Sequence, residues 1–352
     1  MKIWLKVVGV NVALLLGGLL ILELIFGNWV FGPDYREMNI PRNTVRVFDV
    51  DGLYAGGGQI TYTRDRHGLR GPYRDIGAID MLTLGGSTTN QLYVDDAKTW
   101  QAVMRQGFAA AGKPRTIVNA AVDGQSTRGH IAVFERWFPL IDGLKARYIL
   151  VYAAINDLAV EAQEKYDDMR SPNPARRFAT AVKNKSAVYD FYKTVRGMLA
   201  AMNAQVVHGA QTRNGLTWEK WQPADARLTA PAGTAERLAA YAERLRKLDE
   251  KIRDFGAKAI FVTQPIASYR LKDGWLWLPV GETRQSAENN TLEIFAFNRI
   301  TLDVCRDIGA ICIDLASDLE FVDADFYDWV HYTDIGARKV GEYLYRALED
   351  IL

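Results

Sequence analysis

The chain has 352 residues, enough to bury a large core in one domain with insertions or in two domains. Apolar residues make up 49% of the chain and charged residues 24%, a globular balance that excludes a largely disordered protein. The 43 Lys and Arg residues nearly equal the 42 Asp and Glu residues, so the net charge of +1 gives no reason to expect nucleic acid as a partner.

The chain begins with a long apolar segment, residues 7–26, which only Asn11 and Glu23 interrupt. About 20 helical residues cross the hydrocarbon core of a bilayer. No A-x-A-like cleavage site follows, which favours an uncleaved signal anchor over the alternative, a cleaved secretion signal. Lys2 and Lys6 precede the segment and few basic residues follow it at once, which predicts a cytoplasmic amino terminus and an extracytoplasmic remainder.

The composition divides the chain into three predicted regions. We expect residues 1–30 to form a cytoplasmic tip and a transmembrane helix, and residues 31–78 to form an extracytoplasmic region of loops with one or two edge strands. We expect residues 79–352 to form the main domain, with an insertion at about 158–236 that caps the site.

From residue 79 onward, apolar runs typical of buried strands alternate with amphipathic helical segments. The predicted strands are 79–84, 116–121, 148–153, 259–263 and 310–313, and the predicted helices are 99–111, 128–140, 238–255, 291–308 and 334–352. This alternation predicts an α/β fold, a doubly wound parallel sheet with helices on both faces. Such sheets bind ligands at the carboxyl ends of their strands.

Two features outside the predicted sheet have more than one interpretation. Trp218 and Trp221, in the insertion, are able to bind a sugar or a partner, but such tryptophans more often fasten a loop to its own domain. Cys305 and Cys312 are too few for a disulfide framework and lack the spacing of a metal site. We interpret them as packed thiols, with a single bridge as the alternative in an oxidising compartment.

The first predicted strand leads into a tight turn that carries a serine. Gly85 and Gly86 follow the apolar residues, and Ser87 opens the next helix. The glycines allow a sharp bend, and N–H groups at the start of a helix face a position where negative charge is stabilised. A nucleophilic serine needs such a position, although helix capping and phosphate binding use similar turns.

The other partners for ester hydrolysis occur further along the chain. His331 would act as the base toward Ser87, and Asp328, three residues earlier, would orient its ring. The N–H groups of Ser87 and Gly124 and the amide of Asn156 would form an oxyanion hole. Each residue also has an ordinary structural explanation as a cap, a turn glycine or a satisfied polar group, but the alternating topology would bring all of them to one edge of one sheet.

The blocks GGST, AVDGQST, AAIND and DWVH resemble, in this order, the four signature blocks of the SGNH hydrolases, also called GDSL-type esterases. The resemblance covers residues 81–352 and implies a flavodoxin-like sheet, Ser87 as nucleophile, Gly124 and Asn156 as oxyanion donors, and the pair Asp328 and His331 completing a triad. Its members are mostly metal-free enzymes that cleave or transfer acyl esters on lipids, sugars or polysaccharides.

The sequence departs from this family at two positions. Gly85-Gly86-Ser87 replaces the usual Gly-Asp-Ser, and Ala154 stands where the third block normally opens with glycine, which places a methyl group near the oxyanion hole. The anchor and the GGSTT block resemble bacterial envelope members. This similarity implies a single-pass protein of the cytoplasmic (inner) membrane with its catalytic domain in the periplasm.

We therefore expect a serine esterase that cleaves O-acyl esters, in particular acetyl esters, on an envelope glycan or lipid, without a cofactor or metal. The alternatives are an O-acyltransferase with the same triad and a non-catalytic envelope scaffold. A metal hydrolase is disfavoured because only Asp328, His331 and Asp334 cluster in the sequence.

Overall fold

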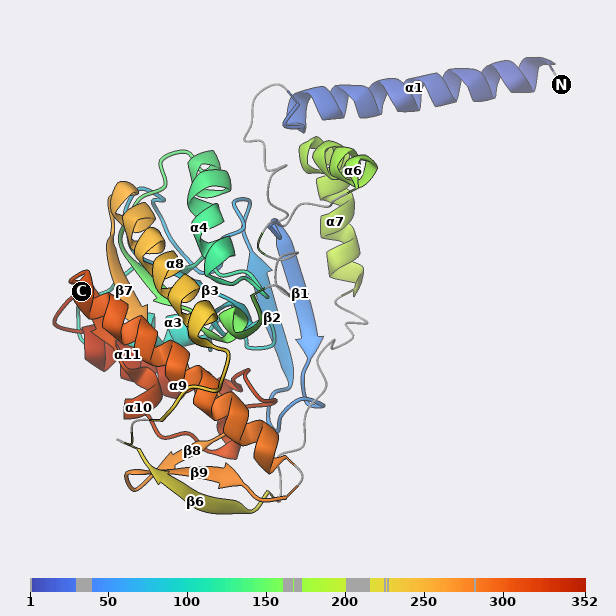
Figure 1. Cartoon of the computed structure of the whole chain (residues 1–352). Helices are drawn as coiled ribbons and strands as arrows, with labels where there is room; N and C mark the ends of the chain where they lie inside the picture. Colours follow the sequence, from blue (N-terminus) through green and yellow to red (C-terminus); the bar gives the residue numbers. More distant parts are fainter. Residues whose placement is uncertain are drawn as a thin grey trace.

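The computed structural model describes residues 2–29, 40–160, 167, 173–200, 216–224, 226, 228–281 and 283–352. Parts of the predicted loop region (30–39) and of the predicted insertion (161–166, 168–172 and 201–215) lie outside the described residues. Figure 1 shows a layered α/β body, with helix α1 (Lys2–Phe26) extending away from it.

Five parallel strands form the central sheet, in the order β10-β7-β5-β3-β4. They are β3 (Ile79–Gly85), β4 (Ile117–Asn119), β5 (Ala146–Tyr152), β7 (Lys258–Val262) and β10 (Ile311–Ile313). Counted along the chain this is the order 2-1-3-4-5, the flavodoxin-like arrangement. The prediction of a doubly wound parallel sheet is confirmed, and the carboxyl ends of the strands meet at one edge.

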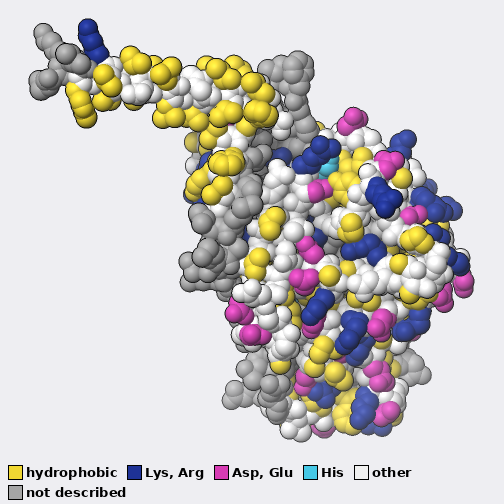
Figure 2. All heavy atoms as spheres, turned by 180° about the vertical axis from the view of Figure 1, so that it is seen from behind, with side chains coloured by type: hydrophobic (Ala, Val, Ile, Leu, Met, Phe, Trp, Pro, Cys, Tyr) yellow, Lys and Arg dark blue, Asp and Glu magenta, His cyan; other side chains and the backbone are white. Residues whose placement is uncertain are grey.

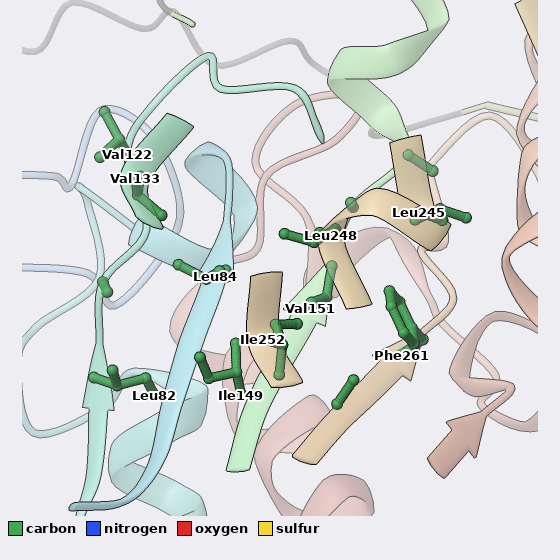
Figure 3. Packing of buried hydrophobic residues seen from close by; sticks show 14 of the residues in the cluster. Leu82, Leu84, Val122, Val133, Ile149, Val151, Leu245, Leu248, Ile252 and Phe261 are labelled. Atoms are coloured by element: carbon green, nitrogen blue, oxygen red, sulfur yellow. The ribbon is translucent and has the colours of Figure 1, made fainter. Parts of the chain in front are cut away.

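Helices cover both faces of this sheet because each one buries an apolar stripe. The helices are α3 (Trp100–Ala110) and α11 (Asp334–Leu348) on one face, and α4 (Thr127–Arg136), α8 (Ala235–Asp254) and α9 (Arg284–Asp307) on the other. Figure 3 shows how side chains of β3, β5 and β7 meet those of α8; the labelled examples are Leu82, Leu84, Ile149, Val151, Phe261, Leu245, Leu248 and Ile252. All eight are buried, so the core fixes the positions of the strand ends.

The predicted helices differ from the observed ones mainly at their ends. The segment predicted as one helix over 128–140 ends at Arg136 and continues as a short 3-10 turn, Phe138–Leu140. Pro139 explains the break, because it has no N–H for a helical hydrogen bond and its ring clashes with the preceding turn. Helix α9 begins at Arg284, seven residues before the predicted start, and α11 ends at Leu348.

The predicted edge strands of region 31–78 pair with each other and do not join the central sheet. They are β1 (Thr44–Asp49) and β2 (Gln59–Arg64), an antiparallel hairpin. The inward side chains Phe48, Ile60 and Tyr62 form a small core of their own with Tyr93 and Tyr327 from the main domain. The hairpin thus packs on the domain through its side chains.

A second small sheet lies in segments that sequence alone indicates to be connections. It contains β6 (Trp218–Pro223), β9 (Trp275–Pro279) and β8 (Arg270–Lys272). The Lys220 ammonium lies 3.5 Å from the centre of the Trp275 ring, and the Arg270 guanidinium lies 4.2 Å from that of Trp218. Trp221 packs against the main core. These contacts favour the structural interpretation of Trp218 and Trp221, which fasten the sheet to its own domain.

The interpretation of the cysteines as packed thiols is wrong. Cys305 and Cys312 form a disulfide, with their Cα atoms 5.9 Å apart. Cys305 lies in the last turns of α9 and Cys312 in β10, so the short turn between helix and strand brings the two sulfurs together.

Helix α1 is long and apolar enough to cross a membrane, and it is the one described helix with this property. Its stretch Lys6–Phe26 has a mean hydropathy of 2.3, and none of the most apolar part is buried in the protein. This is consistent with a single-pass membrane anchor or with a signal sequence. Two helices from the predicted insertion, α6 (Pro174–Lys185) and α7 (Ala187–Ala200), lie beside the carboxyl-terminal end of α1, which we call its inner end (Figure 1).

Candidate active site

The turn after β3 sets Ser87 at the first position of a four-residue helix, α2 (Ser87–Asn90). Neither preceding glycine has room for a side chain. A Cβ on Gly85 would lie 2.1 Å from Thr89 Oγ1, and a Cβ on Gly86 would lie 2.0 Å from Asn156 Nδ2. The two glycines therefore let the serine turn pack directly against its own helix and against the segment that follows β5.

Asp328 and His331 lie in a small closed loop before α11. A bridge between Phe326 and Tyr332 closes the loop. Asp328 Oδ1 accepts hydrogen bonds from the N–H groups of Val330 (2.9 Å) and His331 (2.7 Å), and Oδ2 lies 2.7 Å from His331 Nδ1. The spacing of three residues thus brings the carboxylate and the imidazole together, as predicted.

The carboxylate of Asp328 is stabilised in its charged form. Burial acts to raise the pKa of Asp328, but hydrogen bonds from the His331 ring and from the N–H groups of Val330 and His331 hold this pKa below its usual value. An ionised Oδ2 accepts a hydrogen bond and does not donate one. Nδ1 of His331 therefore carries the proton, and Nε2 of the neutral ring is an acceptor.

His331 Nε2 lies 2.7 Å from Ser87 Oγ, although the two residues are 244 positions apart in the chain. The three predicted side chains thus form one continuous hydrogen-bonded line from hydroxyl to imidazole to carboxylate. This geometry allows the neutral ring to remove the hydroxyl proton and so to activate the oxygen as a nucleophile.

An aromatic stack that the sequence analysis did not identify supports the imidazole. The Tyr327 ring lies parallel to His331, with ring centres 5.5 Å apart and planes 8° apart. Tyr54 from the hairpin region stacks on Tyr327 with ring centres 6.1 Å apart, and Tyr93 meets Tyr327 edge to face. The one sequence signal was an aromatic residue next to the Asp-Trp-Val-His block. Through this stack the β1–β2 region helps to hold His331 in place.

The predicted oxyanion donors lie around the serine turn. Gly124 has a φ of 76°, which favours glycine, and the N–H of nearby Val122 donates to Gly85 O (3.1 Å). Asn156 Nδ2 donates to Gln125 O (2.8 Å), and its second hydrogen remains for another acceptor. Among the residues that the structure describes, the N–H groups of Ser87 and Gly124 donate to no acceptor. Three donors are thus available near the nucleophile.

Ala154, where the family has glycine, keeps a backbone conformation that suits glycine. Its φ is 145°, and its carbonyl accepts hydrogen bonds from the N–H groups of Asp157 (2.8 Å) and Leu158 (3.2 Å). An L-residue in this region stores strain of about 1 to 3 kcal/mol. The strained alanine ends the apolar strand and starts the turn that presents Asn156.

Gln264, which sequence reasoning missed, joins two of the strand-end turns. Its Oε1 accepts from Ile155 N (2.9 Å), and its Nε2 donates to Thr88 Oγ1 (2.9 Å). Asn298 of α9 holds the Gln264 backbone from both sides, with bonds of 3.0 and 2.8 Å. The sequence does contain a signal for Gln264, because this residue follows an apolar strand, as Ser87 and Asn156 do.

Buried charges tie the loops around the site together. Asp157 accepts from Thr127 Oγ1 (2.6 Å) and from the Arg244 guanidinium (3.0 Å), and so links the turn after β5 to α4 and α8. Burial raises the pKa of Asp157 to about 6, against the effect of these hydrogen bonds. Arg70, fully buried, donates to the carbonyls of Gln91 (3.0 Å) and Val94 (2.7 Å) and so fixes the segment after the serine helix.

His130 lies in the interior of α4, and neither ring nitrogen makes a hydrogen bond of normal geometry with a described residue. Burial lowers the pKa of His130 to about 4, although the Gly85 carbonyl opposes this shift. The ring is therefore neutral at physiological pH and sits near the end of β3. In the described ranges, no group of three or more His, Cys, Asp or Glu side chains is arranged to hold a metal ion.

Comparison with known proteins gives two kinds of match. The model of the GDSL-like Lipase/Acylhydrolase family matches residues 83–339. Similar solved structures include TesA (13% identity, covering 78% of this chain and 99% of that chain, TM-score 0.43). They also include a catalytic mutant of Axe2, an acetylxylan esterase from Geobacillus stearothermophilus, with 12% identity, covering 78% of this chain and 96% of that chain, and a TM-score of 0.43. A third is a member of the lipolytic protein G-D-S-L family from Veillonella parvula, with 12% identity, covering 78% of this chain and 98% of that chain, and a TM-score of 0.42. No curated protein matches the chain in sequence.

Proposed function

The chain belongs to the GDSL-like lipase/acylhydrolase family and is an ester-hydrolysing serine hydrolase. From this premise we propose that it cleaves O-acyl esters through a triad of Ser87, His331 and Asp328. The observation that carries the proposal is the pair of 2.7 Å hydrogen bonds that join the hydroxyl, the imidazole and the carboxylate. A family match alone does not say which residues act, and this line of contacts supports one set.

In the first step Ser87 Oγ attacks the ester carbonyl carbon while His331 Nε2 takes its proton. The imidazolium that forms is stabilised by the ionised Asp328. The negative charge on the former carbonyl oxygen is stabilised by hydrogen bonds that the N–H groups of Ser87 and Gly124 and the second Nδ2 hydrogen of Asn156 donate to it. His331 then returns the proton to the alcohol oxygen, the ester bond breaks, and the acyl group remains on Ser87.

In the second step a water molecule donates its proton to His331 Nε2 and attacks the acyl carbon. The bond to Ser87 Oγ breaks, the proton returns to Oγ, and the carboxylic acid leaves. The Tyr327 ring, parallel to the imidazole, limits rotation of His331 through both steps. Gln264 keeps the turns that carry Ser87 and Asn156 at a fixed separation.

We further propose that α1 is a single-pass anchor in the cytoplasmic (inner) membrane and that the catalytic domain lies in the periplasm. The unburied apolar surface of α1 supports the anchoring. The lysines before the span support the orientation. The disulfide between Cys305 and Cys312 supports it independently, because such bonds persist in oxidising compartments. An acylated glycan or lipid of the envelope, with acetyl as the acyl group, is then the proposed substrate.

The test uses the full chain in detergent. A serine-reactive fluorophosphonate should label the protein, and Ser87→Ala and His331→Ala should lose the label, whereas Ser317→Ala on the exposed surface should keep it. A series of p-nitrophenyl esters and acetylated glycans then identifies the acyl group, with acetate release as the readout. Labelling that survives in Ser87→Ala would contradict the assigned nucleophile.

The same assay separates the remaining alternatives. Acetate that appears on a second sugar instead of in solution would identify an O-acyltransferase, since the acyl-enzyme is then resolved by a sugar hydroxyl. A correctly folded protein with neither label nor turnover would identify a non-catalytic scaffold.

A further inference from the structure

Helix α7 carries an apolar stripe that the protein does not bury. Val188, Phe191, Tyr192 and Val195 are spaced at i, i+3, i+4 and i+7, so they share one face of the helix. Their exposed fractions run from 36% to 72%. On an ordinary surface helix a stripe of this kind faces the core, so its exposure points to an apolar or interfacial surrounding.

Helix α6, which contacts α7, also exposes apolar side chains. Phe178 is as exposed as Phe191, at 72%, and Val182 follows it one turn later. We call α6 and α7 together with these exposed side chains the α6–α7 face. Figure 2 shows hydrophobic side chains continuing from α1 onto the helices beneath its inner end.

The α6–α7 face is attached to the end of the apolar helix α1. The Asn28 N–H donates to Lys185 O (2.9 Å), and Glu23 accepts from the N–H groups of Ala187 (3.0 Å) and Val188 (3.1 Å). These bonds join the junction of α6 and α7 to the last turn of α1. A membrane that α1 crosses therefore has its surface at the level of this junction.

The charge of this segment fits an anionic lipid surface. Residues 173–200 contain six Lys or Arg residues and a single acidic residue, Asp190, in a chain whose net charge is only +1. Basic residues beside exposed aromatic ones are typical of helices that lie in the headgroup region of a bilayer. A second copy of the chain would bring the same positive charge to this face, so electrostatics favours lipid over self-association.

We propose that the α6–α7 face lies in the headgroup region of the membrane that α1 crosses and binds anionic phospholipids there. A single span alone leaves the catalytic body free to swing about its tether. The second contact fixes its orientation, because α7 also packs against β1 of the hairpin that supports His331. The inference rests on the proposed anchoring by α1 and not on the proposed ester hydrolysis.

The test places a fluorophore on the stripe of the full chain in vesicles. Phe191→Cys is labelled with NBD without reductant, since the two native cysteines are bonded to each other. Val195→Cys provides a second site on the stripe, and Ser317→Cys on α10 (Leu315–Asp318) is the exposed control. Vesicles contain either phosphatidylcholine alone or phosphatidylcholine with phosphatidylglycerol. Quenching by doxyl lipids reports contact with lipid, and quenching by iodide reports contact with water.

We expect both stripe probes to be quenched by doxyl lipids in vesicles with phosphatidylglycerol and to be shielded from iodide at least about threefold relative to the control. The shielding should weaken in phosphatidylcholine alone. Iodide access equal to that of the control would overturn the proposal. So would shielding without doxyl quenching, which would show that protein and not lipid covers the face. Release of the chain by alkaline carbonate would instead remove the anchoring premise, and this outcome leaves the esterase assay unaffected.

Discussion

The edge of the central sheet and the α6–α7 face use the same kinds of side chains in opposite ways. At the sheet edge the aromatic rings of Tyr93 and Tyr327 are buried, and they hold an imidazole in place. On the α6–α7 face Phe178 and Phe191 are largely exposed and belong to none of the hydrophobic clusters of the described residues. The protein itself completes the first region, and we propose that a membrane completes the second.

We infer from this difference that separate parts of the chain carry reactivity and location. The proposed triad and oxyanion donors lie on turns that a buried core and a buried ion pair fix, whereas the apolar helices α6 and α7 lie outside that core. Changes in one region should therefore leave the property of the other unaltered. The following predictions test this separation, beginning with the largest expected effect.

Asp328→Asn should lower kcat by about a thousandfold to ten-thousandfold. The asparagine oxygen still accepts from Val330 and His331, but its amide group turns a donor toward Nδ1. The ring then carries its proton on Nε2 and no longer accepts from Ser87. The measurement is hydrolysis of p-nitrophenyl acetate, with vesicle binding unchanged. The matched control is Asp303→Asn, which changes an exposed residue of α9. A near-normal kcat in Asp328→Asn would contradict the proposed triad.

Asn156→Ala should lower kcat by about a hundredfold to a thousandfold and change KM little, because the lost donor acts on the charged intermediate. Asn156→Asp keeps the side-chain size and should be at least as impaired, since a carboxylate repels the oxyanion. Asn290→Ala on the exposed face of α9 serves as control. If Asn156→Ala raised KM alone, the residue would bind substrate without stabilising the oxyanion.

Protonation of His130 should lower the free energy of unfolding as the pH falls, because His130 is buried in its neutral form. Its pKa is about 4 in the folded protein and about 6.5 in the unfolded chain, so the unfolded chain binds the proton first. Between pH 7 and pH 5 this group costs about 2 kcal/mol of unfolding free energy, whereas Asp157, with its pKa raised to about 6, acts in the opposite direction. Urea unfolding of the protein and of His130→Asn at both pH values isolates the His130 contribution as the difference between them. An equal slope in the variant would assign the loss to other groups.

Ala154→Gly should raise the unfolding free energy by about 1 kcal/mol. The gain is the strain released at a φ of 145°, less the cost of ordering a glycine. Ala153→Gly, next to it and without a positive φ, should destabilise the protein instead. Calorimetric Tm values of both variants check the opposite signs, and destabilisation by both would show that Ala154 is not strained.

The double variant Phe178→Ser and Phe191→Ser should have the smallest effect on the sheet edge. We expect kcat on a water-soluble ester to stay within about twofold of the unmodified protein, because both side chains are largely exposed and belong to none of the packed clusters of described residues around the site. The same variant should lose the lipid contact described above. A large loss of kcat in detergent would show that the two regions are coupled.

The residues at the site were visible in the sequence because their signals are local. Gly85, Gly86 and Ser87 follow an apolar run, and Asp328 and His331 are close enough to meet within one loop. Their meeting across 244 positions followed from the alternation of strands and helices, which fixes where strand ends lie.

Other features depend on packing that no local pattern specifies. Gln264 bridges two turns only because the folded sheet places β7 beside β5. The pairing of Cys305 with Cys312 depends on the turn between α9 and β10. The stripe on α7 has an ordinary helical period, and the period alone does not tell whether the core or another surrounding covers it.

The contact between Gly86 and Asn156 also bears on which residues the serine turn accepts. A Cβ at position 86 would lie 2.0 Å from Asn156 Nδ2, so any side chain there requires the Asn156 amide to move. An aspartate at this position, as in the usual Gly-Asp-Ser, would therefore shift a proposed oxyanion donor while leaving Ser87, His331 and Asp328 unchanged. Position 86 thus offers a way to tune the rate of this site without touching its reacting side chains.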